Sequence, residues 1–113
     1  MDHKIAVVII AVTEMDRAVR FYRDVLGLEL KFQTAEYTEF ATKGAVLALE
    51  KRKEVISTGP SFTFATAEIG ADHRKLQSAK VTFWKDLHEE SFGQVMMPKD
   101  SEGNVFEVVQ YKS

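Results

Sequence analysis

One charged side chain lies inside an apolar run near the end of the chain. The sequence EGNVFEVVQ at 102–110 predicts a turn followed by a strand in which Glu107 is flanked by Val and Phe residues. A carboxylate there can ligate a metal, act as a general base, or orient a polar or cationic group of a ligand. A solvated side chain without a chemical role is the alternative. Burying an unpaired carboxylate is costly, so we expect Glu107 to meet donors, water, a cation or a proton.

Other residues that catalyse reactions or bind metals are few. The chain has no cysteine, which excludes thiol catalysis, thiolate metal sites and disulfides. The three histidines lack the spacing of a metal site. We expect His3 to be a frayed terminal residue, His73 to be half-buried on a short helix, and His88 to be solvated in a charged loop.

Length and composition predict one globular domain that spans residues 1–113. Hydrophobic residues make up 45% and charged residues 28% of the chain. The formal net charge is -2 and no block of like charge occurs, so the basic footprint of a nucleic-acid-binding protein is missing. The apolar run at 5–12 is too short to span a bilayer and lacks the features of a signal peptide. We expect a soluble, cytoplasmic protein with no nucleic-acid or membrane partner.

The first half of the chain predicts one helix among several strands. The β-branched run 5–12 favours a strand covered on both faces. The segment 13–27 predicts an amphipathic helix with Thr13 as N-cap, a capping box with Asp16, and Gly27 just past its end. Strands are predicted at 28–33, 37–41 and 45–51. A polar segment with Gly59-Pro60 follows as a linker.

The same order of elements repeats in the second half. A strand is predicted at 61–66, a shorter helix at 69–80, and strands near 81–87, 92–97 and 105–110. VTEM at 12–15 matches TAEI at 66–69 at an offset of 54, and GAVLAL at 44–49 matches GNVFEV at 103–108 at an offset of 59. Two β-α-β-β-β modules are therefore expected, at about 4–53 and 61–111, with a linker at about 54–60. Because neither module could bury its sheet alone, we expect them to form one unit.

The segment VTEMDRAVRFYRDVLGLEL, the ending FG…PKDSEGNVFEVVQ and the internal repeat resemble the glyoxalase, bleomycin-resistance and extradiol-dioxygenase superfamily, also called vicinal oxygen chelate proteins. The resemblance covers about Lys4 to Tyr111. It implies an α+β fold in which two βαβββ modules form a curved, mostly antiparallel sheet with the helices on its convex side. The family turn D-P-D-G-N is altered, since Ser101 replaces the Pro and Glu102 the second Asp, which we expect to make the turn less rigid.

The resemblance also locates the positions of a family metal site. In metal-using members four equivalent strand positions supply the ligands, two from each module. By motif these positions hold Val7, Ala48, Ser61 and Glu107 in this chain. One carboxylate is too little, because a divalent catalytic site needs about three protein ligands. We therefore expect no metal and no other cofactor.

A concave, ligand-holding face is a further implication of the resemblance. Alternation along the strands would place Ser61 and Thr63 on that face beside Glu107. Aromatic residues on the lining strands would give apolar contact area for a flat ligand, although core or dimer-interface packing would equally explain them. The candidate ligand-binding residues are Glu107, Ser61, Thr63, Tyr37, Trp84 and Phe92.

Three functions remain open on the sequence. The first is a metal-independent small-molecule-binding protein, similar to the drug-binding resistance members and forming a homodimer, with the ligand in an apolar-aromatic cleft beside Glu107. The second is an enzyme of the lyase, isomerase or dioxygenase type, with Glu107 as metal ligand or general base. The third is a dimerisation module without a ligand. The sequence does not name the substrate.

Overall fold

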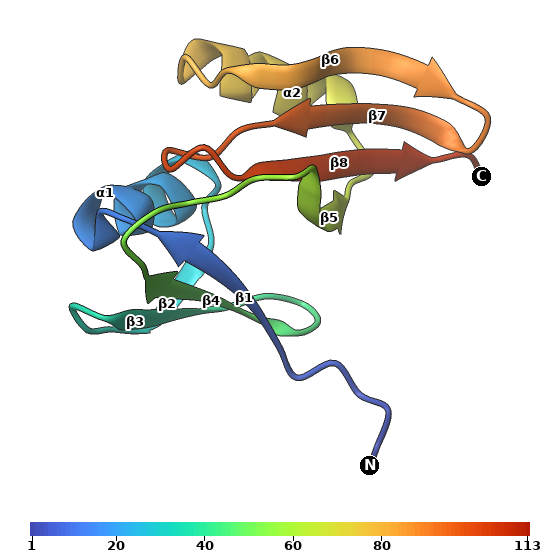
Figure 1. The fold of residues 1–113 in the computed structure, drawn as a ribbon. Coiled ribbons are helices and arrows are strands. Elements are labelled where there is room, and N and C mark those ends of the chain that lie inside the picture. The colour runs from blue at the N-terminus through green and yellow to red at the C-terminus, as the bar shows by residue number, and fades with distance from the viewer. The chain divides into compact units, whose positions relative to one another are not determined.

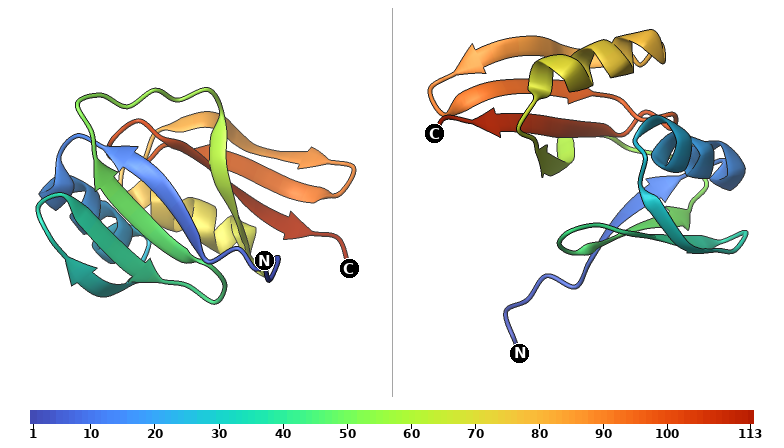
Figure 2. Two further views of the ribbon diagram at one scale, coloured as in Figure 1. Left: turned by 60° about the horizontal axis from the view of Figure 1, so that its bottom comes forward. Right: turned by 180° about the vertical axis from the view of Figure 1, so that it is seen from behind.

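The computed structural model describes residues 1–113, which divide into two compact units, Met1–Val55 and Ile56–Ser113 (Figure 1). Each unit contains one helical segment and one four-stranded mixed sheet. The α+β class and the repeated β-α-β-β-β order are therefore confirmed, with the sheet divided into two, one in each unit. Views from two further directions show that each helix covers one face of its own sheet (Figure 2). No helix of the chain is long and apolar enough to cross a membrane.

The first unit is built around a sheet with the strand order β1-β4-β3-β2. Strands β1 and β4 are parallel, and the other neighbours are antiparallel. The elements are β1 (Val7–Val12), α1 (Met15–Arg20), the π-helix η1 (Phe21–Val25), β2 (Glu29–Gln33), β3 (Tyr37–Ala41) and β4 (Val46–Lys51).

The single helix predicted for 13–27 is two segments in the structure. The N-cap is Glu14 rather than the predicted Thr13, and the Glu14 side chain makes no capping hydrogen bond. After α1 the helix widens, and the amide of Leu26 donates to the carbonyl of Phe21 at 3.1 Å. The wider turn allows the adjacent aromatic residues Phe21 and Tyr22 both to be buried. Gly27 has a φ of 75° and ends the helix as predicted.

One face of the first sheet packs on this helix. The Thr38 hydroxyl donates to the sulfur of Met15 at 3.2 Å, and the rings of Tyr22 and Phe40 lie 5.9 Å apart. Thr38 and Phe40 are therefore on the helix face, together with their strand partners in β4. Because strand side chains alternate, the residues between them lie on the opposite, helix-free face.

The second unit repeats this plan with the strand order β5-β8-β7-β6. Strands β5 and β8 are parallel, and the other neighbours are antiparallel. Its elements are β5 (Pro60–Ala65), α2 (Ile69–Ser78), β6 (Phe83–Glu90), β7 (Gly93–Pro98) and β8 (Val105–Tyr111). The observed bounds differ by at most three residues from the predicted ones.

The helix face of the second sheet carries an aromatic core. The Phe106 ring is fully buried, stacks on Phe62 with centroids 5.5 Å apart and meets Phe64 edge-on. The Gln110 side chain accepts a hydrogen bond from the first amide of α2, at Ile69, at 2.8 Å. Phe106 and Gln110 therefore point toward α2, and alternation places Val105, Glu107 and Val109 on the helix-free face.

The turn before β8 is held by one buried carboxylate. Asp100 is 6% exposed and accepts hydrogen bonds from the amides of Glu102 and Asn104, both at 2.8 Å, and from the Asn104 side chain at 3.0 Å. Gly103 has a φ of 88°, which glycine adopts without strain. These bonds fix the start of β8, and hence the position of Glu107, without the family's proline.

Candidate ligand-binding face around Glu107

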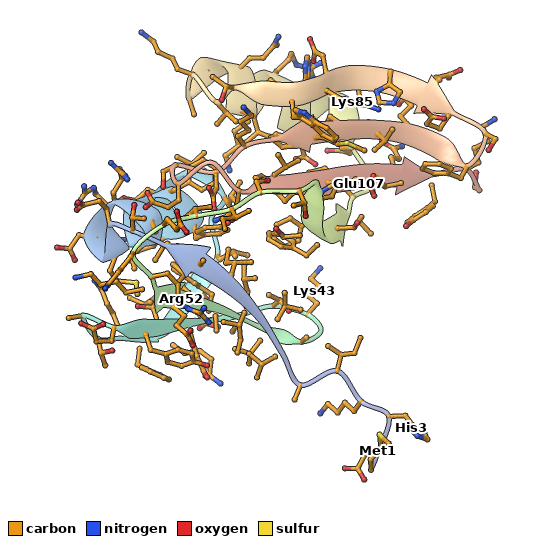
Figure 3. All side chains as sticks on the ribbon, viewed as in Figure 1. Met1, His3, Lys43, Arg52, Lys85 and Glu107 are labelled. Atoms are coloured by element: carbon orange, nitrogen blue, oxygen red, sulfur yellow. The ribbon has the colours of Figure 1, made fainter.

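Glu107 lies in the middle of β8 on the helix-free face of the second sheet (Figure 3). Its side chain is half-buried between the buried residues Phe106 and Val108 of the same strand. Phe106 and Val108 lie on the face of the sheet that packs against α2, which explains why the sequence on either side of Glu107 is apolar. The carboxylate itself remains within reach of solvent.

One side chain positions the Glu107 carboxylate. Thr63 of β5 is its strand partner, and the Thr63 hydroxyl donates to Glu107 Oε1 at 3.0 Å. No Lys, Arg or His side chain forms a salt bridge with Glu107. One oxygen of the carboxylate is therefore held by the protein, and the other is available to a donor or cation from outside.

Ser61, predicted to share this face, differs from Thr63 in that it does not pair with a residue of β8. In the β5–β8 register Pro60 pairs with Val105 and Thr63 pairs with Glu107, so a bulge lies between Pro60 and Thr63. The register shift leaves Ser61 without a pairing residue in β8, so its contact with a ligand stays a prediction. Ser61 is exposed, and no hydrogen bond joins it to Glu107.

The strands beyond β8 continue the row that contains Glu107. Extending the β7–β8 register by one residue places Met97 beside Glu107, and Met97 is the partner of Lys85 in β6. Two strand spacings put Lys85 about 10 Å from Glu107. The Lys85 ammonium lies over the ring of Trp84, 5.5 Å from the ring centroid, and Trp84 is 50% exposed. Trp84 thus already contacts a cation through its π face.

Phe92 lies at the end of the sheet and away from this row. It occupies the turn between β6 and β7, and its ring is 6.3 Å from that of Tyr111. Tyr111 is four residues from Glu107 along β8, which corresponds to about 13 Å in an extended strand. The structure therefore brings Thr63 to Glu107 and does not bring Phe92 there. As a ligand contact, Phe92 stays a prediction.

In the first unit, Tyr37 has a partner that the sequence did not suggest. The Tyr37 hydroxyl donates to Glu39 Oε2 at 2.7 Å on the helix-free face of β3. This hydrogen bond, with burial and the charges of Glu39 and Glu50, raises the pKa of Tyr37. The Phe32 ring of β2 lies 6.0 Å from the Tyr37 ring. Strict alternation in YTEFA, with Thr38 and Phe40 buried, is the signal that would have placed Glu39 on this face.

The internal repeat explains why only the second unit carries the Thr–Glu pair. In the first unit Ile9 pairs with Ala48, and in the second Thr63 pairs with Glu107. These pairs are related by the sequence offsets of 54 and 59. Apolar side chains therefore stand in the first unit where hydroxyl and carboxylate stand in the second.

The residues present do not fit the metal site of the fold family. Val7 and Ala48 offer no ligand atom, and nowhere in the chain are three or more His, Cys, Asp or Glu side chains grouped to hold an ion. A lone carboxylate does not meet the demand of a divalent ion for about three protein ligands.

Two of the three histidines, His73 and His88, have partners within the fold. His73 of α2 contacts the Phe83 ring and lies 2.6 Å from the Asp86 carboxylate, so it is half-buried as predicted. His88 is half-buried in strand β6, 3.1 Å from Glu90, so the prediction of a solvated loop residue is wrong. Its charged neighbours, typical of a loop, lie on the exposed edge strand of the sheet.

Comparison with known proteins identifies the family of the chain. The sequence model of the Glyoxalase/Bleomycin resistance protein/Dioxygenase superfamily matches residues 4–108. The chain belongs to this superfamily. No curated protein matches the sequence significantly.

Solved structures share the superfamily fold at low sequence identity. TioX from Micromonospora sp. ML1 has a TM-score of 0.78 at 20% identity, covering 95% of this chain and 98% of that one. TnmS3, an antibiotic binding protein from Streptomyces sp. CB03234, has a TM-score of 0.79 at 20% identity, covering 99% and 98%. Lactoylglutathione lyase from Agrobacterium tumefaciens has a TM-score of 0.81 at 19% identity, covering 96% and 93%. These likenesses establish the fold of the chain.

Proposed function

We propose that this protein binds a small cationic ligand at the helix-free face of its second unit, through Glu107 and without a metal. The observation that carries the proposal is a half-buried carboxylate with one hydrogen-bonded oxygen, one available oxygen and no cationic partner in the protein. A carboxylate in that setting gains most from an incoming cation, because the surrounding apolar strand weakens its hydration.

The neighbourhood of Glu107 suggests a ligand with an apolar, flat part. The β7–β8 register, extended by one residue, puts Met97 beside Glu107, and Trp84, 50% exposed, precedes the Met97 partner Lys85 in β6. Methionine and tryptophan provide adaptable apolar contact area for such a ligand. TnmS3, which shares the fold, is an antibiotic binding protein, and that use of the fold supports a binding role here.

A matched pair of probes tests the charge requirement. N-methylacridinium carries a permanent charge on a flat ring system, and acridine at mildly alkaline pH is the same ring system without the charge. Trp84 is the one tryptophan of the chain, so quenching of its fluorescence reports binding in the second unit. We expect the wild-type protein to prefer the cation by at least about tenfold, or about 1.4 kcal/mol.

Two variants locate that preference. Glu107→Gln should lower the affinity for N-methylacridinium to that for acridine. Glu89→Gln removes one charge from the opposite face of the same sheet, because Glu89 pairs with Gln94 on the helix side, and should change neither affinity more than twofold. If the wild-type protein binds both probes equally, or neither, the proposal is wrong.

An enzymatic role for Glu107 is the competing proposal. Lactoylglutathione lyase and Oxidase ChaP-H2, which share the fold, are enzymes by name. A half-buried carboxylate with one available oxygen is also suited to act as a general base. Turnover of a bound compound that disappears in Glu107→Gln would favour the enzyme over the binding protein.

A homodimer and a cytoplasmic location complete the proposal. The first unit exposes apolar side chains on β1 and the residues before it, with Ile5 72%, Val7 38% and Ile9 54% exposed. Such residues on an edge strand favour association with a second copy. The absence of cysteine accords with a reducing compartment. Light scattering at several protein concentrations would test the dimer.

A further inference from the structure

A second charged side chain lies on the same face of the second unit as Glu107. The β7–β8 register, extended by one residue, aligns Glu107 with Met97, and Met97 pairs with Lys85 of β6. Because paired strand residues share a face, the row Glu107–Met97–Lys85 crosses three neighbouring strands of one sheet. Figure 3 labels the two ends of the row, Glu107 on β8 and Lys85 on β6. All three residues belong to the unit Ile56–Ser113, so this one sheet sets their spacing.

A β-bulge places Trp84 beside Lys85. The β6–β7 register shifts between Phe83 and Lys85, where β6 has one residue more than β7. The extra residue is Trp84, so two consecutive side chains of β6 can lie together rather than on opposite faces. The Lys85 ammonium accordingly lies over the Trp84 ring, 5.5 Å from its centroid.

Lys85 keeps its charge available to a partner from outside the protein. It is exposed, and no salt bridge joins it to a carboxylate. An aromatic ring attracts a cation but carries no net charge, so the three ammonium donors of Lys85 remain available to an anion. The contact with Trp84 also restricts the lysine side chain, which lowers the entropy that it would lose on binding. Lys85 and Glu107 are therefore opposite charges on one face, and neither has an oppositely charged partner in the protein.

The spacing of these two charges limits what can bind both. Two strand spacings separate Lys85 from Glu107 by about 10 Å, too far for one small ion to contact both. Met97 is half-buried between them and offers an adaptable apolar surface. We propose that the ligand is a zwitterion whose cationic group binds Glu107, whose anionic group binds Lys85, and whose flat apolar middle covers Met97. This inference rests on the proposed function, because it adds an anionic group to the cation proposed there.

A set of rigid aromatic compounds tests the two charges separately. 4′-Amidinobiphenyl-4-carboxylate, the long zwitterion, carries an amidinium and a carboxylate at opposite ends, separated by a distance close to two strand spacings. 4-Amidinobiphenyl keeps only the cation, and 4-amidinobenzoate, the short zwitterion, keeps both charges too close together to span Met97. By isothermal titration calorimetry, the wild-type protein should bind the long zwitterion about three- to tenfold more tightly than 4-amidinobiphenyl. The short zwitterion should show no such advantage, and added salt should reduce the advantage of the long one.

Variants of single lysines locate the anion-binding group. Lys85→Gln should lower the affinity for the long zwitterion to that for 4-amidinobiphenyl, whose own affinity should not fall. Lys85→Arg keeps the charge and the contact with Trp84, and should retain the advantage of the long zwitterion. Lys112→Gln removes a positive charge from the exposed end of the same unit and is the matched control. Lys99 pairs with Val105 on the face of Glu107, so a loss in Lys99→Gln in place of Lys85→Gln would overturn the inference.

The outcomes separate this inference from the proposed function. If the wild-type protein binds 4-amidinobiphenyl and N-methylacridinium through Glu107 but binds the long zwitterion no more tightly, the inference fails and the proposed function stands. The same conclusion follows if Lys85→Gln keeps the advantage of the long zwitterion. If the wild-type protein binds neither cation, the proposed function fails and this inference with it.

Discussion

Removing the Thr63–Glu107 hydrogen bond tests whether Glu107 stabilises the fold or is instead available to bind a ligand. Thr63→Val keeps the branched shape and removes the hydroxyl that donates to Glu107 at 3.0 Å. A net hydrogen bond to a charged group stabilises a protein by about 1.5–3 kcal/mol when buried. Thr63 is exposed, so in Thr63→Val a water molecule can replace the hydroxyl as donor to Glu107. We therefore expect the free energy of unfolding to fall by only about 0.5–1.5 kcal/mol.

Glu107→Gln should cost less still. The amide oxygen that this substitution introduces would accept the same bond from Thr63, and the half-buried charge would be removed. No cationic side chain loses its partner, because Glu107 has none. We therefore expect the free energy of unfolding to change by no more than about 0.5 kcal/mol.

Urea unfolding followed by Trp84 fluorescence measures these losses in the unit that contains Glu107. The double variant Thr63→Val/Glu107→Gln then gives the coupling between the two side chains. A loss of about 3 kcal/mol or more in Glu107→Gln would refute the reasoning, because that is the cost of breaking a buried ion pair. Glu107 would then be a structural residue with an essential charged partner.

Three further predictions concern the frame that holds the site. Gly93→Ala should destabilise the protein by about 2–4 kcal/mol in thermal unfolding, because the added Cβ would lie 2.1 Å from a β8 carbonyl oxygen and the φ of Gly93 is 147°. The control Gly44→Ala adds its Cβ in open space and should change stability by less than about 0.5 kcal/mol. Asp100→Ala leaves three turn donors without their acceptor and should cost about 2–3 kcal/mol in urea. The pKa of Asp86 is lowered by the amide of the next residue and then by His73, so Asp86→Asn should reduce stability at neutral pH. The difference from wild type should shrink as the pH falls below the ordinary carboxyl pKa and vanish below the lowered pKa of folded Asp86. A difference that stays constant down to acid pH would contradict this prediction.

Much of the fold could be predicted because the sequence contains an internal repeat of the same order of elements. The match between GAVLAL and GNVFEV fixed the last strand of each module, and the structure pairs Ile9 with Ala48 as it pairs Thr63 with Glu107. Alternation then placed Glu107 on the face away from the helix. Both predictions depended on local patterns that a strand imposes on its sequence.

Two local features depend on backbone irregularities that such patterns do not reveal. A bulge in β5 shifts Ser61 out of register, and a π turn after α1 buries Phe21 beside Tyr22. Glu39 was missed for a different reason. Glu39 accepts a hydrogen bond from Tyr37, two residues away. Predicting that bond requires the rotamers of both side chains as well as the face on which each residue lies.

The most direct test of the central claim is the affinity for N-methylacridinium measured on protein of known metal content, with and without chelator. Glu107 alone should hold the cation, so the account predicts substoichiometric metal in the purified protein and the same affinity with EDTA present. One divalent ion per chain, lost in Glu107→Gln, together with an affinity that EDTA abolishes, would contradict it. Glu107 would then be a metal ligand, and the protein would have to be considered an enzyme of its superfamily.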